Sequence, residues 1–137
     1  MPRWLKIGAA QMGPNQDGTP REAIVERMLA LLEAAARDGG ELIVYPEMAL
    51  TTYFPKRIRQ DYDQFFETEV PPKALEPLLR RAAEARVAVH VRFCEEADGR
   101  FFNTCSQLTN GTRFNCSSPS EPVYWRQPNF NEIVRYS

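Results

Sequence analysis

The stretch "ELIVYPEMALTTYFP" (residues 41–55) decides the fold, because it joins an apolar run of strand length to a turn. Every residue from Leu42 to Tyr45 is apolar, which is typical of a parallel strand covered on both faces. Pro46 ends this run and Glu47 follows it. In open α/β sheets, ligands bind beyond the carboxyl ends of the strands. Glu47 is therefore a candidate catalytic base.

The role of Glu47 depends on its surroundings. A carboxylate that is buried at such a position can transfer protons near neutral pH, because desolvation disfavours its charged form. Since the run places Glu47 against further apolar residues, we expect it to be buried. The structural alternative is a carboxylate that caps a turn or pairs with an arginine. Position alone leaves both roles open.

The segment before this strand predicts another strand and a helix. Residues 4–12 are partly apolar and end in a turn-rich stretch, which predicts a buried strand. Thr19, Pro20 and Glu22 have the spacing of a capping box, so we expect Thr19 to be the N-cap. Gly39–Gly40 should end the helix. Its apolar positions recur with helical period: Ile24, Val25, Met28, Leu31, Leu32 and Ala35.

The segment after this strand continues the alternation. Residues 73–86 predict a second helix, residues 87–96 a third strand, and residues 101–109 a fourth strand after the turn "ADGR". Strand, helix and strand form a right-handed βαβ unit, so the pattern predicts an α/β layer fold. From Asn110 onward no period is visible and Asn, Ser and Pro accumulate, so we expect irregular structure there.

The composition limits the classes of function. The chain has 137 residues, with 17 Lys plus Arg, 18 Asp plus Glu and a net charge of -1. This balance gives no strong field to attract nucleic acid or an anionic membrane. No segment approaches the roughly 18 apolar residues of a membrane span, and the amino terminus lacks the pattern of a secretion signal. We expect a cytoplasmic protein with neither kind of partner.

The metal-ligating residues are few. The three cysteines stand at unrelated spacings, and His90 is the single histidine. Neither a disulfide framework nor a metal site is predicted by this set, and we expect no cofactor.

The stretch "LIVYPEMALTTYFP" resembles the first catalytic motif of the nitrilase (carbon-nitrogen hydrolase) superfamily, most closely that of N-carbamoyl-D-amino acid amidohydrolases. Further similarity lies in "AAQMGP" at 9–14, "FFETEVP" at 65–71 and Phe102-Asn103-Thr104. The resemblance covers about residues 4–108. The matching positions of the motif are Pro46, Glu47, Leu50, Thr51, Thr52, Phe54 and Pro55.

The resemblance implies a four-layer α-β-β-α sandwich, of which this chain carries only the first part. Residues 1–108 would form the amino-terminal part of a carbon-nitrogen hydrolase domain, and residues 109–137 a divergent tail. The implied activity is hydrolysis of non-peptide C–N bonds, with a small carbamoyl or amide substrate. The most similar proteins convert N-carbamoyl amino acids to amino acid, ammonia and carbon dioxide.

The implied mechanism uses a Glu as general base, a Cys as nucleophile and a Lys that stabilises the oxyanion. Glu47 carries over as the base. The family's lysine lies beyond the Phe-Asn-Thr segment, whereas Lys6, Lys56 and Lys73 all precede it. No position matches the nucleophile either, since Cys116 lacks a preceding strand and a following helix. We expect this chain alone to be truncated and inactive.

Other hypotheses remain. Cys94 and Cys105 lie in predicted strands, where a free Cys is most often a small buried hydrophobe, and His90 lies among valines. Arg92 stands where the resembling family has a small residue near its pocket. A partial sandwich would expose an apolar face, so homo-oligomerisation or association through the open sheet is expected. The chain is then a non-catalytic interaction module, or else a short amidase using Cys105 or Cys116.

Overall fold

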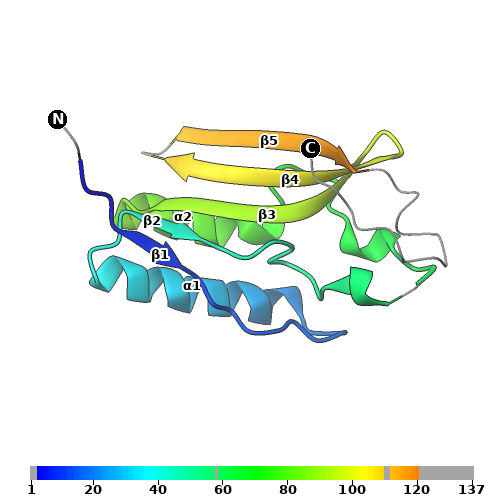
Figure 1. The fold of residues 1–137 in the computed structure, drawn as a ribbon, viewed down its shortest axis with the longest axis horizontal. Helices are drawn as coiled ribbons and strands as arrows, with labels where there is room; N and C mark the ends of the chain where they lie inside the picture. Colours follow the sequence, from blue (N-terminus) through cyan, green and yellow to red (C-terminus); the bar gives the residue numbers. More distant parts are fainter. Residues whose placement is uncertain (1–2, 58, 110–111, 121–137) are drawn as a thin grey trace.

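The computed structural model describes residues 3–57, 59–109 and 112–120, the last by backbone alone. Two helices and a five-stranded sheet make up the described fold (Figure 1). The helices are α1 (Arg21–Arg37) and α2 (Glu76–Ala85). The strands follow one another across the sheet in chain order: β1 (Ile7–Ala9), β2 (Leu42–Val44), β3 (Ala88–Ala97), β4 (Arg100–Thr109) and β5 (Thr112–Ser120).

The sheet is mixed. β1, β2 and β3 pair in parallel, and β3, β4 and β5 pair antiparallel. The predicted strand-helix-strand unit is therefore confirmed. Asp98 and Gly99 form the two-residue turn between β3 and β4, and both have positive φ, 53° and 71°. This is the backbone of the tight hairpin turn that an Asp-Gly pair favours.

One face of the sheet packs on both helices. From α1, Ile24, Met28 and Leu32 are at most 2 % exposed, and Val25 is also buried, as the helical period predicted. Leu31 and Ala35 are only half-buried at the edge of this core. The sheet contributes the following buried apolar residues: Ile43, Tyr45, Val89, Val91, Phe93 and Leu108.

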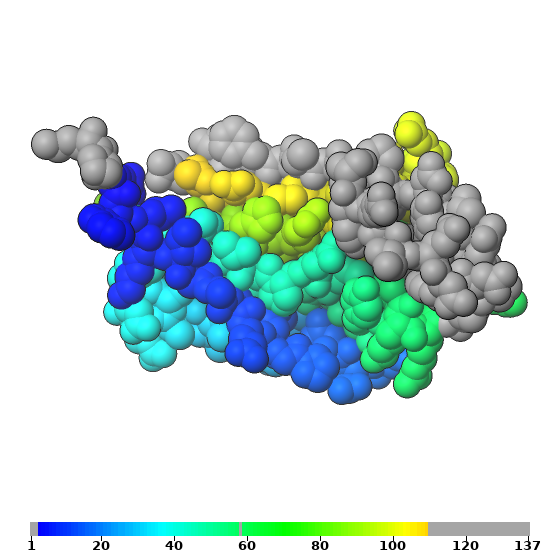
Figure 2. Space-filling view, in the orientation of Figure 1, coloured from blue at the N-terminus to red at the C-terminus, as the bar shows by residue number. Residues whose placement is uncertain are grey.

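The other face of the sheet is less covered, and we call it the open face. Its residues alternate with the buried ones along each strand: Ile7, Ala9, Leu42, Val44, Ala88, His90, Arg92, Asn103 and Cys105. All of them are half-buried or exposed. In the middle of Figure 2, atoms of β3 and β4 reach the surface. The expectation that β2 is covered on both faces is wrong for the described residues, because both helices lie on one side.

An aromatic cluster covers one end of the open face. Phe54 stacks on Phe65 with ring centroids 4.7 Å apart, and Phe66 packs on Phe101 of β4 at 4.4 Å. Cys94 of β3 is buried beneath this cluster. The segment that supplies the aromatic rings follows β2 directly, so the end of the sheet near Cys94 has apolar cover while the centre has little.

The predicted capping box is wrong. Pro20 occupies the N-cap position, and no side chain caps α1. Thr19 lies one residue too early, because its N–H donates to the Gln16 carbonyl (3.1 Å) in the preceding turn. The Pro20 carbonyl instead accepts the first helical bond from Ile24 (3.2 Å). The proline therefore precedes the helix rather than opening it.

The predicted end of α1 is confirmed. Gly39 has a φ of 72°, and its N–H donates to the Ala36 carbonyl. A Cβ on Gly40 would lie 2.9 Å from the Ala35 carbonyl oxygen, so the chain can turn here only with a glycine. The second predicted helix is also confirmed, with a 3-10 turn at Lys73–Leu75 leading into α2.

The expectation of irregular structure after Asn110 is wrong for β5. Thr112–Ser120 pairs with β4 along its whole length, with Thr109 opposite Thr112. Backbone pairing at a sheet edge requires no apolar period, and Pro119 is tolerated in an edge strand. The Asn-Gly pair at 110–111, a common hairpin dipeptide, was the missed signal. Residues 121–137 lie outside the described part, so the division at residue 108 stays a prediction.

Candidate active site

A strained turn places Glu47 at the carboxyl end of β2. Met48 has a φ of 53°, a left-handed conformation that costs about 1–3 kcal/mol for a residue other than glycine. Hydrogen bonds to β3 hold the turn on both sides: Tyr45 N–H donates to the His90 carbonyl (2.9 Å), and Ala49 N–H donates to the Arg92 carbonyl (3.2 Å). The turn therefore has a fixed position on the sheet.

Asn15 and the remaining motif residues support this turn from within. The Asn15 side-chain amide donates to the carbonyls of Ala49 and Thr51, both at 3.0 Å. Thr51 and Thr52 are buried, and Phe54 is 1 % exposed in the aromatic cluster. These residues pack the turn, and Glu47 is the exposed carboxyl-bearing residue of the motif.

The Glu47 carboxylate lies beside β4. Its Oε1 accepts a hydrogen bond from Nδ2 of Asn103 at 2.6 Å. The expectation of a buried Glu47 is wrong for the described residues, because its side chain is exposed. The turn directs the Glu47 side chain away from the helix-covered face and toward the open face. Only a further layer of protein packed on the open face would desolvate it. The Asn103 partner, 56 residues away, was missed although its Phe-Asn-Thr segment was recognised.

Cys94 is close to Glu47 but is not an activated nucleophile. Its side chain is 8 % exposed, and burial raises the pKa of the Cys94 thiol to about 12. The negative charge of Glu47 raises this pKa further, while Arg21 acts in the opposite direction. The thiolate is the reactive form of cysteine. The prediction that Cys94 is a small buried hydrophobe is therefore confirmed.

Cys105 has a partner that the sequence did not suggest. Its Sγ lies 3.4 Å from Nδ1 of His90 and 3.8 Å from Nε2 across the β3–β4 pair. Partial burial and the charge of Arg92 lower the pKa of His90, so its imidazole is neutral near pH 7. The sequence signal that could have predicted this contact is the Asp98-Gly99 turn. A two-residue turn fixes the register of the hairpin, and the register brings His90 and Cys105 close together.

The cations near the site are arginines. Arg92 is half-buried on the open face, and its buried Nε has no hydrogen-bond partner among the described residues. Lys6 binds the Asp38 carbonyl, and Lys56 and Lys73 belong to 3-10 turns. Within the described ranges no lysine contacts Glu47. The oxyanion-stabilising cation is not assembled by these residues.

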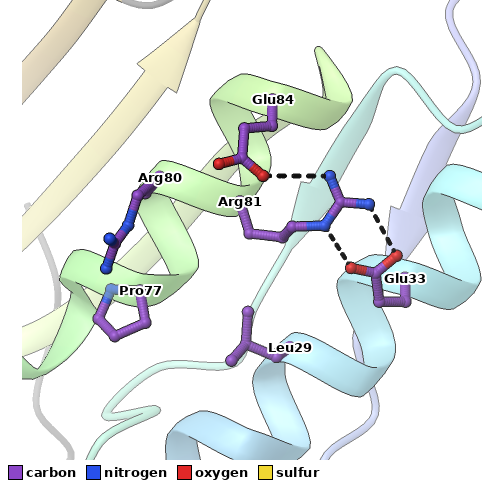
Figure 3. Close-up of a pocket in the computed structure, with 6 residues that line it drawn as sticks. All are labelled: Leu29, Glu33, Pro77, Arg80, Arg81 and Glu84. Carbon is purple, nitrogen blue, oxygen red and sulfur yellow. Dashed lines mark hydrogen bonds and ion pairs between the residues drawn. The ribbon is translucent and has the colours of Figure 1, made fainter.

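A hollow lies between the helices α1 and α2, away from Glu47. It has a volume of about 430 Å³ and is crossed by an ion-pair network in which Arg81 binds Glu33 and Glu84 (Figure 3). Nε of Arg81 donates to Oε1 of Glu33 at 2.5 Å, and this hydrogen bond lowers the pKa of the Glu33 carboxyl. The hollow has the character of a solvated helix-helix contact.

Residues 3–57 and 59–109 contain no group of three or more His, Cys, Asp or Glu side chains that could hold a metal ion. No helix in the same part of the chain is long and apolar enough to cross a membrane.

A sequence model of one protein family, described as "Carbon-nitrogen hydrolase", matches residues 6–132. The match continues past residue 108, where the resemblance drawn from the motifs ends. It covers the Glu47 turn, both helices and all five strands.

Solved structures show the same fold. A carbon-nitrogen hydrolase from Helicobacter pylori G27 superposes with a TM-score of 0.69 at 17% identity over 93% of this chain and 45% of its own. An N-terminal amidase with Gln-Val peptide gives 0.67 at 18% identity, over 89% and 30%. A glutamine-dependent NAD(+) synthetase from Cytophaga hutchinsonii gives 0.57 at 24%, over 80% and 18%. The chain thus spans less than half of each structure, and the predicted α/β fold is confirmed.

Proposed function

Because the chain belongs to the carbon-nitrogen hydrolase family, we propose that it supplies the general base of a site that hydrolyses non-peptide C–N bonds. The observation that carries this proposal is the Glu47 carboxylate on its strained turn, held by Asn103. Asn103 donates to Oε1 and so fixes the orientation of the carboxylate. Oε2 can then accept a proton from a nucleophile or a water molecule.

The proposed substrate is an N-carbamoyl amino acid, and the products are amino acid, ammonia and carbon dioxide. The support is the run from Pro46 to Pro55, which is most similar to that of N-carbamoyl-D-amino acid amidohydrolases. A thiolate would attack the ureido carbon, ammonia would leave, and water activated by Glu47 would hydrolyse the acyl-enzyme. A small carbamoyl or amide molecule is thus the proposed ligand, in a cytoplasmic protein.

We also propose that the chain alone does not turn over substrate. Cys94, the thiol near Glu47, is buried with a raised pKa, and no lysine contacts Glu47 in the described part. An oxyanion-stabilising donor is worth about 3–4 kcal/mol, so its lack alone slows the reaction by a factor of several hundred. Glu47 would then serve a nucleophile and a cation from outside the described residues.

The alternative is a non-catalytic interaction module. The observation that favours it is the open face, where Leu42 and Val44 are half-buried and Ile7 is 56 % exposed. Apolar side chains at the centre of a sheet form a docking surface for a second copy or a related hydrolase. Sedimentation analysis of the chain, alone and with such a hydrolase, separates a defined complex from non-specific aggregates.

The test of the main proposal combines turnover and binding. We expect no ammonia release from N-carbamoyl-D-amino acids, but a specific shift of the Asn103 side-chain amide signals in NMR titration. Glu47→Gln should weaken that shift, and Glu76→Gln, at the start of α2, is the matched control. Release of ammonia that Glu47→Gln abolishes would contradict the inactivity and support the base. An unchanged NMR spectrum would contradict the carbamoyl substrate.

A further inference from the structure

Two cysteines occupy opposite register positions in the β4–β5 pair. The antiparallel register places Cys105 directly opposite Cys116. Directly opposed residues in such a pair have Cα atoms about 4.5–5.5 Å apart and belong to the same face of the sheet. Disulfides join residues whose Cα atoms are about 4.4–6.8 Å apart. The backbone therefore brings these residues to disulfide spacing.

A proton acceptor stands beside one of these cysteines. The 3.4 Å approach of His90 Nδ1 to the Sγ of Cys105 allows the thiol to donate its proton to the neutral imidazole. Cys105 is half-buried, so a small oxidant can reach it. Arg92 lies directly opposite Cys105 in the β3–β4 register, so a positive charge is also near. The imidazole can therefore take up the thiol proton as the Cys105 sulfur attacks an oxidant.

We propose that Cys105 and Cys116 are a thiol pair that a hydroperoxide oxidises to a cross-strand disulfide. The sulfur of Cys105 attacks the peroxide oxygen, the O–O bond breaks, and water leaves when hydrogen peroxide is the oxidant. The sulfenic acid formed at Cys105 is then attacked by the sulfur of Cys116, which releases a second water. Two thiols lose two electrons and two protons, and the peroxide is reduced to two waters.

The disulfide ties the edge strand to the sheet. β5 is the last strand in the sheet order and pairs within the described residues with β4 alone. A covalent link near the middle of the pair prevents β5 from separating from β4. This site involves neither Glu47 nor a substrate, so it stands apart from the proposed hydrolysis.

The third cysteine is an internal control. Cys94 stands opposite Asn103 in the register and is buried, with a thiol pKa raised to about 12. Trypsin cleavage after Arg92, Arg100, Arg113 and Arg126 puts the three cysteines on three different peptides. The identity of two disulfide-linked peptides therefore shows which two cysteines have formed the bond.

The experiment treats the full chain at low concentration with hydrogen peroxide, alkylates free thiols, and maps the tryptic peptides without reduction. We expect peptides 101–113 and 114–126 to be linked, with a loss of two hydrogen atoms and no dimer. The link should disappear in Cys105→Ser and in Cys116→Ser but persist in Cys94→Ser. His90→Gln should slow its formation.

Other patterns overturn the proposal. A link that includes Cys94, or links between two chains only, shows that the β4–β5 register does not select the pair. Sulfinic or sulfonic acid at Cys105 without a link shows that Cys116 does not reach the sulfenic acid. Circular dichroism of each serine variant, compared with the parent chain, shows whether loss of a link reflects loss of folding.

Discussion

The two faces of β3 differ sharply although their residues alternate along one strand. Val89 and Val91 point toward the helices and are 0 % exposed. His90 and Arg92, between and after them, are half-buried on the open face. Val89 and Val91 form part of the core, whereas His90 supplies a base and Arg92 a cation. Because side chains alternate between the two faces of a β-strand, neighbouring residues of β3 can serve the core and a reactive site in turn.

The largest expected effect compares two leucines on the two faces. Leu32 of α1 is 0 % exposed, so Leu32→Ala should lower the free energy of unfolding by about 2–5 kcal/mol through lost burial and a cavity. Leu42→Ala, at a half-buried position of the open face, should cost clearly less. Urea denaturation of both variants measures the difference. Equal losses would show that the open face is packed as tightly as the core.

The next expected effect is a pH dependence caused by Cys94. Its folded pKa is raised from 9.0 to about 12, chiefly by burial. The stability that it contributes is therefore fully present below pH 9.0 and is lost as the pH rises toward about 12. Urea denaturation across this range should show a shallower decline in Cys94→Ala than in the parent. Identical slopes would mean that the aromatic cluster does not exclude water from the thiol.

A smaller effect is expected at Tyr45, where β2 meets α1. The Tyr45 hydroxyl donates to the Met28 carbonyl at 2.7 Å, so Tyr45→Phe should cost about 1 kcal/mol of unfolding free energy. Tyr53, which is 56 % exposed, is the matched control, and Tyr53→Phe should change stability very little. Thermal denaturation of both variants provides the comparison. A loss of similar size in both would argue that the Tyr45 hydrogen bond is not specific to the core.

The smallest effect on stability is expected on the open face at Asn103. Its hydrogen bond to Glu47 is exposed, so Asn103→Ala should change the free energy of unfolding by less than about 0.5 kcal/mol. The same change should free the Glu47 carboxylate, which NMR of its side chain can detect. A large destabilisation would assign the hydrogen bond to the folding of the β2 turn rather than to the site.

Local patterns were sufficient for much of the fold. The apolar run at 42–45 predicted the parallel strand, the helical period predicted the buried residues of α1, and Asp98-Gly99 predicted the hairpin. Each of these signals extends over a few residues and depends on backbone preference and burial. The prediction of a capping box at Thr19 was wrong because another local preference prevailed. Thr19 N–H donates to the Gln16 carbonyl in the preceding turn, so Thr19 is not the N-cap.

The candidate site was predictable only in part. The order of elements located Glu47 at the carboxyl end of β2, and its catalytic role stays a prediction. The exposure of Glu47 depends on which face the helices cover, and its bond to Asn103 depends on the position of β4. Neither condition is visible in the residues around 47.

The sequence alone therefore determined the order of the elements from β1 to β4, the buried side of α1, and the place of Glu47. These properties follow from short-range periodicity and turn chemistry. The tertiary structure decided the pairing of β5, the contact of His90 with Cys105 and the partner of Glu47. Such contacts join residues far apart in the chain, and they form only when strand register and the covering of each face are set together.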